Sequence, residues 1–238
     1  MPSFSRFPNK ALCALGGITL LGACSSTSLA TTASKQQPLV EQAASSVKSF
    51  FNNENQAQRA AKLLKKSHAV MVCPSISNIS LIFGGSGGRC TLLSRDARGS
   101  WSDPAFYTIS SGTFGLQLGY QHSQLMLFIT SKRGVQALLD HQFTFDANAS
   151  ASFTSFGGSA QSSHVSGGKH DIYALQQVNG VFAGGALGGS KLSADSAANR
   201  AYYQQYVGPE DIVVNMRVNN PSADVLRRAL MEAEKKAR

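Results

Sequence analysis

The sequence predicts an α+β domain in which a curved, glycine-rich antiparallel β-sheet, closing toward a barrel, is flanked by N- and C-terminal helices. Several runs between residues 79 and 187 alternate apolar with polar or small residues, as in strands with one buried face. Periods of three to four residues, typical of amphipathic helices, precede and follow this region. Among the glycines beyond Gly22, all but Gly208 lie between residues 84 and 189, a density typical of sharply bent sheets.

The elements are expected in the following order. Residues 40–64 predict one amphipathic helix, and residues 69–73 a short strand that Pro74 ends. The glycine-rich segment 84–88 is expected to turn the chain before a strand at 89–93. A phosphate-binding loop would need a helix at that point.

The later elements follow the same reasoning. Residues 114–120 and 143–153 alternate between apolar and polar or small residues and predict two half-buried strands. Asn179-Gly180 predicts a tight hairpin between 172–178 and 181–187. The remaining expectations are a polar loop at 158–170, a helix at 197–206, a strand at 212–218 and a last helix from Pro221 with Ser222 as its N-cap.

The composition indicates one globular domain with few charges. The chain has 238 residues, of which 42% are hydrophobic and 15% are charged, too few charges for a disordered chain or a long coiled coil. The formal net charge is +9, which makes nucleic acid or an anionic membrane candidate partners but is too dilute to imply either.

The first 23 residues predict a lipoprotein signal peptide. Arg6 and Lys10 precede an apolar run at 11–21, which is shorter than the roughly 20 residues of a membrane-spanning helix. The run ends in Leu21-Gly22-Ala23-Cys24, which resembles the bacterial lipobox. Cys24 is therefore the predicted lipidation site. The alternative is an ordinary secretory signal with a cysteine near its cleavage site.

The predicted anchor gives the chain three parts: signal peptide 1–23, lipidated Cys24 with a flexible tether to residue 38, and one domain at 39–238. Two acyl chains already anchor a protein stably. We therefore expect a lipid-anchored protein of the bacterial cell envelope. Ser25 favours the outer membrane, with the protein facing the periplasm.

No motif of the sequence predicts catalysis, a cofactor or a metal. The five histidines do not have metal-ligand spacing, and no nucleophile elbow of a serine hydrolase is predicted. Cys73 and Cys90 remain in the exported chain, and two alternatives stay open for them. They are either joined in a disulfide, worth roughly 3 kcal/mol for a loop of this size, or two buried free thiols.

Basic residues form two short clusters that are candidates for binding acidic headgroups. Lys62, Lys65 and Lys66 end the first predicted helix, and Lys132 and Arg133 follow the strand at 125–129 in a predicted loop. Each cation near an anionic surface contributes about 1 kcal/mol before screening. The alternative interpretation is a solvated helix face without a ligand.

An ordered series of motifs resembles the SYLF domain over about residues 39–238. It consists of Trp101-x-x-Pro104-Ala105-Phe106, the glycine-rich stretch from Gly112 to Gly119, Gly134-Val135-x-Ala137-Leu138-Leu139, the stretch from Asn179 to Gly184, and Asn199-x-x-Tyr202-Tyr203. Eukaryotic members of this family bind phosphoinositides, and some bind actin. The resemblance implies headgroup contacts by Lys48, Lys62, Lys65 and Lys66.

The resemblance predicts an envelope lipoprotein whose SYLF domain binds anionic lipids, such as phospholipid or lipopolysaccharide phosphate. Nucleic acid is not an expected partner, and no enzymatic activity is expected. The alternative is a structural lipoprotein without a lipid ligand, whose glycine-rich sheet docks a protein partner of the envelope.

Overall fold

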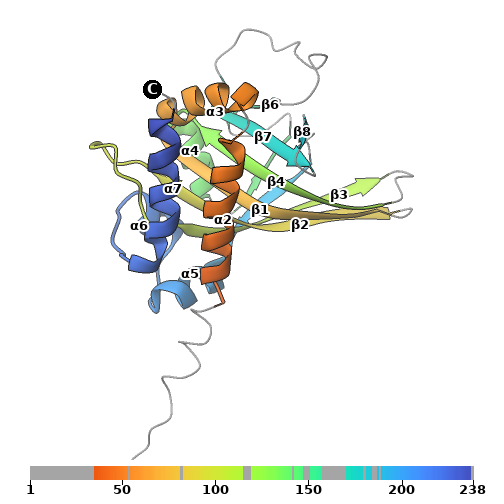
Figure 1. Ribbon diagram of the computed structural model, residues 1–238. Coiled ribbons are helices and arrows are strands. Elements are labelled where there is room, and N and C mark those ends of the chain that lie inside the picture. The colour runs from red at the N-terminus through yellow and green to blue at the C-terminus, as the bar shows by residue number, and fades with distance from the viewer. Residues whose placement is uncertain are drawn as a thin grey trace, which may run out of the picture.

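The computed structural model describes residues 35–236 except 53, 81–82, 115–118, 141, 147–150, 157–169, 179–180, 184–186 and 188. One nine-stranded sheet organises this part of the chain, with helices on both of its faces (Figure 1). The strands are β1 Ala69–Ser80, β2 Phe83–Ser94, β3 Ala105–Phe114, β4 Gly119–Ile129, β5 Gln142–Thr144, β6 Phe153–Phe156, β7 Ile172–Val178, β8 Val181–Ala183 and β9 Lys191–Ala194. The helices are α2 Gln37–Phe50, α3 Glu54–Lys66, α4 Lys132–Leu139, α5 Ser196–Tyr203, α6 Pro209–Val213, the 3₁₀ turn Pro221–Ala223 and α7 Asp224–Lys235.

The sheet runs in the order β5-β9-β3-β2-β1-β4-β7-β6, with β8 paired to β7. This curled sheet with flanking helices confirms the predicted α+β class. Its pairs are antiparallel, with the exception of β6, which lies parallel to β7. The register Val178↔Val181 confirms the predicted hairpin. Its turn residues, Asn179 and Gly180, lie outside the described residues.

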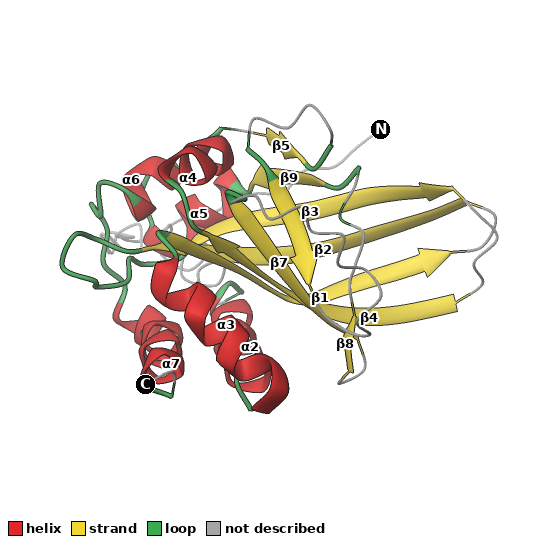
Figure 2. Cartoon of the chain, turned by 90° about the horizontal axis from the view of Figure 1, so that it is seen from above, coloured by secondary structure: helices red, strands yellow, loops and turns green. Residues whose placement is uncertain are grey.

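Two hydrophobic cores cover the two faces of the sheet. Alternate residues of a strand point to opposite faces, so Val70 and Val72 of β1 pack under α2, α3 and α7, whereas Ala69 and Met71 pack toward α4 and α6. The far ends of β1 to β4 extend beyond the helices (Figure 2). No helix in the described part of the chain has the length and apolar character needed to cross a membrane.

The single helix predicted at 40–64 is wrong, because the chain forms two helices with a turn at Phe51 and Asn52. A straight helix of that length would extend about 37 Å. The turn instead lets Ala60 and Leu64 bury in the same core as Val47. The periodicity identified the buried residues correctly, but it carries no information about a change of direction.

Two expectations for the first hairpin are also wrong. Strand β1 does not end at Pro74 but continues through it, and the pairing with β2 shifts between Val72 and Ser75. A bulge tolerates a residue without an N–H. The segment 84–88 lies inside β2 rather than in a turn. A Cβ on Gly88 would lie 2.6 Å from the Ser75 carbonyl oxygen, so close approach of the backbones requires this glycine.

Four further expectations differ from the structure. Residues 114 and 120 belong to β3 and β4 rather than to one strand. Of the strand predicted at 143–153, residues 143–144 belong to β5, residue 153 belongs to β6, and the described residues between them are in neither. Residues 212–218 do not form a strand: Pro209, whose ring presets a helical φ, begins α6 there. Asn220, not Ser222, is the N-cap of the 3₁₀ turn that leads into α7, and its side chain accepts a hydrogen bond from the Ser222 N–H at 3.0 Å. The predicted loop at 158–170 lies outside the described residues except for His170.

Candidate functional site

The predicted headgroup-binding lysines of α3 lie on its outer face. Ala60, Ala61 and Leu64 bury one side of the helix, and Lys62, Lys65 and Lys66 are exposed. Residues three and four apart are neighbours on a helix surface, so the three ammonium groups share one face. They also lie in the last turns of α3, where the helix dipole favours positive charge.

Lysines from two other helices lie at the same end of the molecule. Lys48 is exposed in the last turn of α2, directly before the turn into α3. The C-terminal end of α7 lies beside α3 (Figure 1). There Lys236 Nζ donates to Asn52 Oδ1 at 3.3 Å, and Lys235 is exposed. We call this surface the basic end; its members are Lys48, Lys62, Lys65, Lys66, Lys235 and Lys236.

Arg95 of the loop after β2 fixes α7 against α3. Its Nη2 donates to the Leu64 carbonyl of α3 at 3.2 Å and forms an ion pair with Glu234 of α7. Lys235 and Lys236 were not candidates from the sequence, although they form a visible Lys-Lys pair. The sequence pattern of α7 does not indicate that the C-terminal end of this helix packs beside α3.

Lys132 and Arg133 lie in the first turn of α4 and not in the predicted loop. Ser131 is the N-cap, and its Oγ accepts from the Gly134 N–H at 2.9 Å. Helix α4 packs on the face of the sheet opposite to α3. The structure therefore leaves both residues outside the basic end, although Lys132 is exposed.

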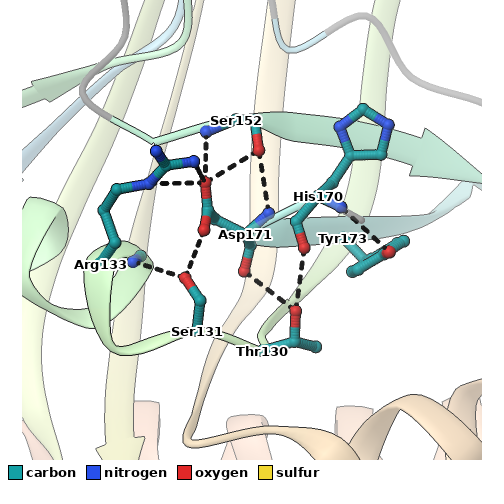
Figure 3. A network of polar contacts seen from close by, with 8 residues as sticks. Thr130, Ser131, Arg133, Ser152, His170, Asp171 and Tyr173 are labelled. Atoms are coloured by element: carbon teal, nitrogen blue, oxygen red, sulfur yellow. Dashed lines mark hydrogen bonds and ion pairs between the residues drawn. The ribbon is translucent and has the colours of Figure 1, made fainter. Parts of the chain in front are cut away.

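Arg133 is an ion-pair partner of Asp171, the first residue before β7. Its Nε donates to Asp171 Oδ2 at 3.1 Å (Figure 3). The same oxygen accepts from the Ser152 N–H and Oγ, both at 2.8 Å, and Ser131 Oγ donates to Oδ1. Burial alone would raise the pKa of Asp171, but the hydrogen bonds from Arg133, Ser131 and Ser152 outweigh it and hold this pKa well below its ordinary value.

The Asp171 network joins three segments that are far apart in the sequence. The Asp171 carbonyl accepts from the Thr130 N–H at 2.8 Å, which ties the end of β4 to the start of β7. Asp171 also donates its own N–H to the Ser152 carbonyl at 3.0 Å, just before β6. Its carboxylate is engaged by protein groups on both oxygens, so we assign this network a structural role.

Cys73 and Cys90 are joined by a disulfide, the first of the two alternatives left open by the sequence. Both residues are fully buried, and they link β1 to β2 beside the bulge at Pro74. Within the described residues, no group of three His, Cys, Asp or Glu side chains could hold a metal ion.

Several described residues of the motifs that carry the family resemblance make contacts within the fold. Asn199 of α5 is fully buried, and its Oδ1 accepts from the Phe106 N–H of β3 at 2.8 Å. Tyr203 Oη donates to the Pro104 carbonyl at 2.7 Å, and Tyr202 Oη to Gln37 Oε1 of α2 at 3.2 Å. The Arg95 guanidinium lies 4.5 Å from the Trp101 ring centroid. The contacts of Asn199, Tyr202 and Tyr203 join α5 to β3 and to α2, and none of the three residues belongs to the basic end.

Comparison with known proteins supports the same family. A family model described as "Ysc84: Las17-binding protein actin regulator" matches residues 110–233. "Protein YSC84" of Saccharomyces cerevisiae is 25% identical over 171 residues, which cover 71% of this chain and 36% of the yeast protein. "SH3 domain-containing YSC84-like protein 1" of Homo sapiens is 23% identical over 183 residues, 68% of this chain and 54% of the human protein. This chain thus spans between about a third and a half of these relatives. It belongs to the Ysc84/SYLF family.

Proposed function

We propose that this protein is a lipid-anchored SYLF-domain protein of the bacterial cell envelope whose basic end binds anionic lipid headgroups. The observation that carries the proposal is that three lysine-bearing elements, the last turn of α2, helix α3 and the last turn of α7, lie at one end of the molecule (Figure 1). Acylation of Cys24 provides the anchor, and phosphate-bearing lipids of the envelope are the ligands. In this proposal the protein has no catalytic activity.

The basic end favours an electrostatic contact at the membrane surface over insertion of a helix. Phe50 and Phe51, the large apolar residues at the end of α2, are 0% and 5% exposed and belong to the core. They are therefore not available to enter a bilayer. Each lysine close to an anionic surface contributes about 1 kcal/mol, and salt screens such contacts. Binding should therefore be modest and sensitive to salt.

The test measures binding of the full chain carrying Cys24→Ser, so that no acyl chain at residue 24 contributes. Vesicles containing phosphatidylglycerol are compared with vesicles of phosphatidylcholine at low salt. Charge reversal by Lys62→Glu, Lys65→Glu and Lys66→Glu should lower affinity for the anionic vesicles by roughly two orders of magnitude. Lys and Glu have similar helix propensities, so circular dichroism should show an intact fold.

A matched triple variant controls for net charge. Arg98→Glu, Lys191→Glu and Arg228→Glu reverse three exposed cations outside the basic end and change the net charge equally. These three substitutions should lower the affinity for anionic vesicles much less than the lysine substitutions do. An equal loss in both triple variants would show that only the overall charge matters, and unchanged affinity in the lysine variant would place the contact elsewhere.

A second candidate function is docking of an envelope protein. The far ends of β1 to β4 project beyond the helices (Figure 2), and they are rich in glycine and serine. The description of the matching family names binding to Las17, a protein ligand. Absence of binding to anionic vesicles at low salt would favour this candidate.

A further inference from the structure

A surface hollow of about 280 Å³ lies between the first half of α2 and the β1–β2 hairpin. Helix α2 crosses the sheet at this point: Arg89 of β2 donates to Gln36 at the start of the helix, and Ser49 near its end donates to Gln177 of β7 at 3.3 Å. The hollow lies on the side of α2 that faces the projecting strands. It is separate from the basic end, which lies at the opposite end of α2.

The lining of the hollow has the chemistry of an anion site. Its ten residues include two cations, Lys35 and Arg89, and no carboxylate. Ser75 and Ser77 also line it, and their hydroxyls lie 3.4 and 3.3 Å from His122 Nδ1. A guanidinium carries five N–H donors in a planar fork that suits phosphate oxygens. Gln36, which is 8% exposed, accepts from Arg89 and holds this fork beside the hollow.

Glycine keeps the strand side of the hollow open. Residues 85, 87 and 89 of β2 share one face of the strand. Gly87 contributes no side chain to that face, and a Cβ there would contact only the Ile109 carbonyl oxygen, at 3.8 Å. This is ordinary van der Waals contact. Packing therefore does not require a glycine at position 87, in contrast to Gly88.

We propose that this hollow binds the phosphate group of an anionic ligand through Arg89, Lys35 and the two serine hydroxyls. Its volume is below the roughly 300–1,000 Å³ of sites that enclose a drug-sized ligand, so it accommodates a headgroup and not acyl chains. The ligand is either a lipid headgroup or a soluble phosphate ester. That the ligand is a lipid headgroup rests on the proposed function, whereas the existence of the phosphate site does not.

Four variants test the site in the full chain carrying Cys24→Ser. Gly87→Val fills the hollow without changing any charge, and valine is favoured in strands. Arg89→Gln removes the guanidinium. Gly85→Val is the matched control: it adds the same side chain two residues away on the same face, outside the hollow, where a Cβ would lie 3.6 Å from the Ser111 carbonyl oxygen. Arg98→Gln controls for loss of one exposed cation.

The probes are inorganic phosphate and glycerol 3-phosphate, followed by amide chemical shifts, and phosphatidylglycerol vesicles, followed by sedimentation. With the soluble probes, we expect shifts at Ser75, Ser77, Gly87 and Gly88 in the parent. Arg89→Gln should weaken binding about fivefold, Gly87→Val should abolish it, and both controls should bind like the parent. Melting temperatures near that of the parent show that each variant is folded.

The outcomes separate this proposal from that of the basic end. Binding of vesicles but not of soluble phosphates, lost in Gly87→Val and kept in Gly85→Val, identifies a lipid headgroup as the source. Binding of soluble phosphates alone identifies a soluble ester and leaves the lysine triple variant to decide the proposed function. The proposal is overturned if neither probe binds, or if Gly87→Val and Gly85→Val behave alike.

Discussion

Single polar side chains determine how the helices and strands of this domain are joined. Asp171 connects the ends of β4, β6 and α4 through its carboxylate and its backbone. Asn199 does the same for α5 and β3 with one buried amide. Removal of the Asp171 carboxylate would leave several donors without an acceptor, and removal of the Asn199 amide would leave the buried Phe106 N–H without one.

The substitution Asp171→Asn should destabilise the domain by about 2 kcal/mol near neutral pH, since hydrogen bonds to a charged group are replaced by weaker ones. The folded-state pKa of Asp171 lies below its ordinary value of about 3.9. Its contribution to stability is therefore fully present above about pH 4 and is lost as the pH falls toward the folded pKa. Urea denaturation at neutral and acidic pH measures the difference between parent and variant.

The difference between parent and Asp171→Asn should thus shrink below about pH 4. Asp140→Asn, at an exposed aspartate that ends α4, provides the control and should leave the urea midpoint unchanged. Arg133→Gln should cost less than Asp171→Asn, because the Arg133 side chain is 67% exposed and exposed ion pairs contribute little. A pH-independent difference would show that the Asp171 charge is not what stabilises the network.

Arg133 also shows what sequence reasoning misses at the scale of a residue. In the sequence, Lys132 and Arg133 are two adjacent cations that are equally good candidates for binding a headgroup. The structure separates them, because Arg133 has a partner 38 residues away in Asp171. Charge alone carries no information about such distant partners.

At the scale of elements, the β1–β2 hairpin supports both the sheet and the hollow. Its bulge at Pro74 and its glycine at 88 let the two strands approach closely. The disulfide between Cys73 and Cys90 closes the hairpin over a separation of 17 residues.

Reduction of this disulfide should lower the free energy of unfolding by about 3 kcal/mol, because the open chain gains entropy in the unfolded state. Urea denaturation with and without dithiothreitol measures the change. Both cysteines are fully buried, so reduction should follow unfolding of the hairpin. The double variant Cys73→Ala, Cys90→Ala should unfold at the same urea concentration in both conditions. Equal midpoints of the parent with and without reductant would contradict the prediction.

The elements that the sequence predicted well are those that local pattern determines. The Asn179-Gly180 pair located a hairpin, and the amphipathic stripe identified buried residues of α2 and α3. Period-two alternation indicated a sheet, but it placed single strands at 114–120 and 143–153, each of which contains parts of two strands. The errors arose where tertiary contacts decide. The turn between α2 and α3, the continuation of β1 through Pro74 and the glycines inside β2 all depend on segments that are distant in the sequence.

The candidate site, like the fold, was predictable from the sequence only in part. The lysines of α3 were identifiable because three cations lie off an apolar stripe, and the structure shows them exposed. Lys235 and Lys236 join the basic end only because α7 packs beside α3. The hollow forms only because the bulged β1–β2 hairpin lies beneath α2. Neither feature has a signal within a single stretch of sequence.

At the scale of the whole molecule, the two proposed contacts lie at opposite ends of α2. The hollow lies at its first turns and the basic end at its last turn. A helix of 14 residues is about 21 Å long. The predicted anchor, Cys24, precedes α2, so the hollow is the nearer of the two surfaces to the anchor along the chain.

The length of the predicted tether therefore decides whether the basic end reaches the membrane that carries the anchor. Residues 25–34 extend at most about 35 Å, more than the length of α2, whereas deletion of residues 26–32 leaves about 10 Å. In the acylated protein on phosphatidylglycerol vesicles, a fluorophore at Gln58→Cys, on the exposed side of α3, should be quenched by headgroup-labelled lipid.

The deletion should abolish quenching at residue 58, because the remaining tether is shorter than α2. A fluorophore at Glu41→Cys, exposed in the first half of α2, should stay quenched and serves as the control. The introduced thiol can be labelled selectively, since Cys73 and Cys90 are joined and acylation occupies Cys24 in the proposal. Quenching at residue 58 that survives the deletion would mean that α3 faces the membrane without needing the tether, and the proposed orientation would be wrong.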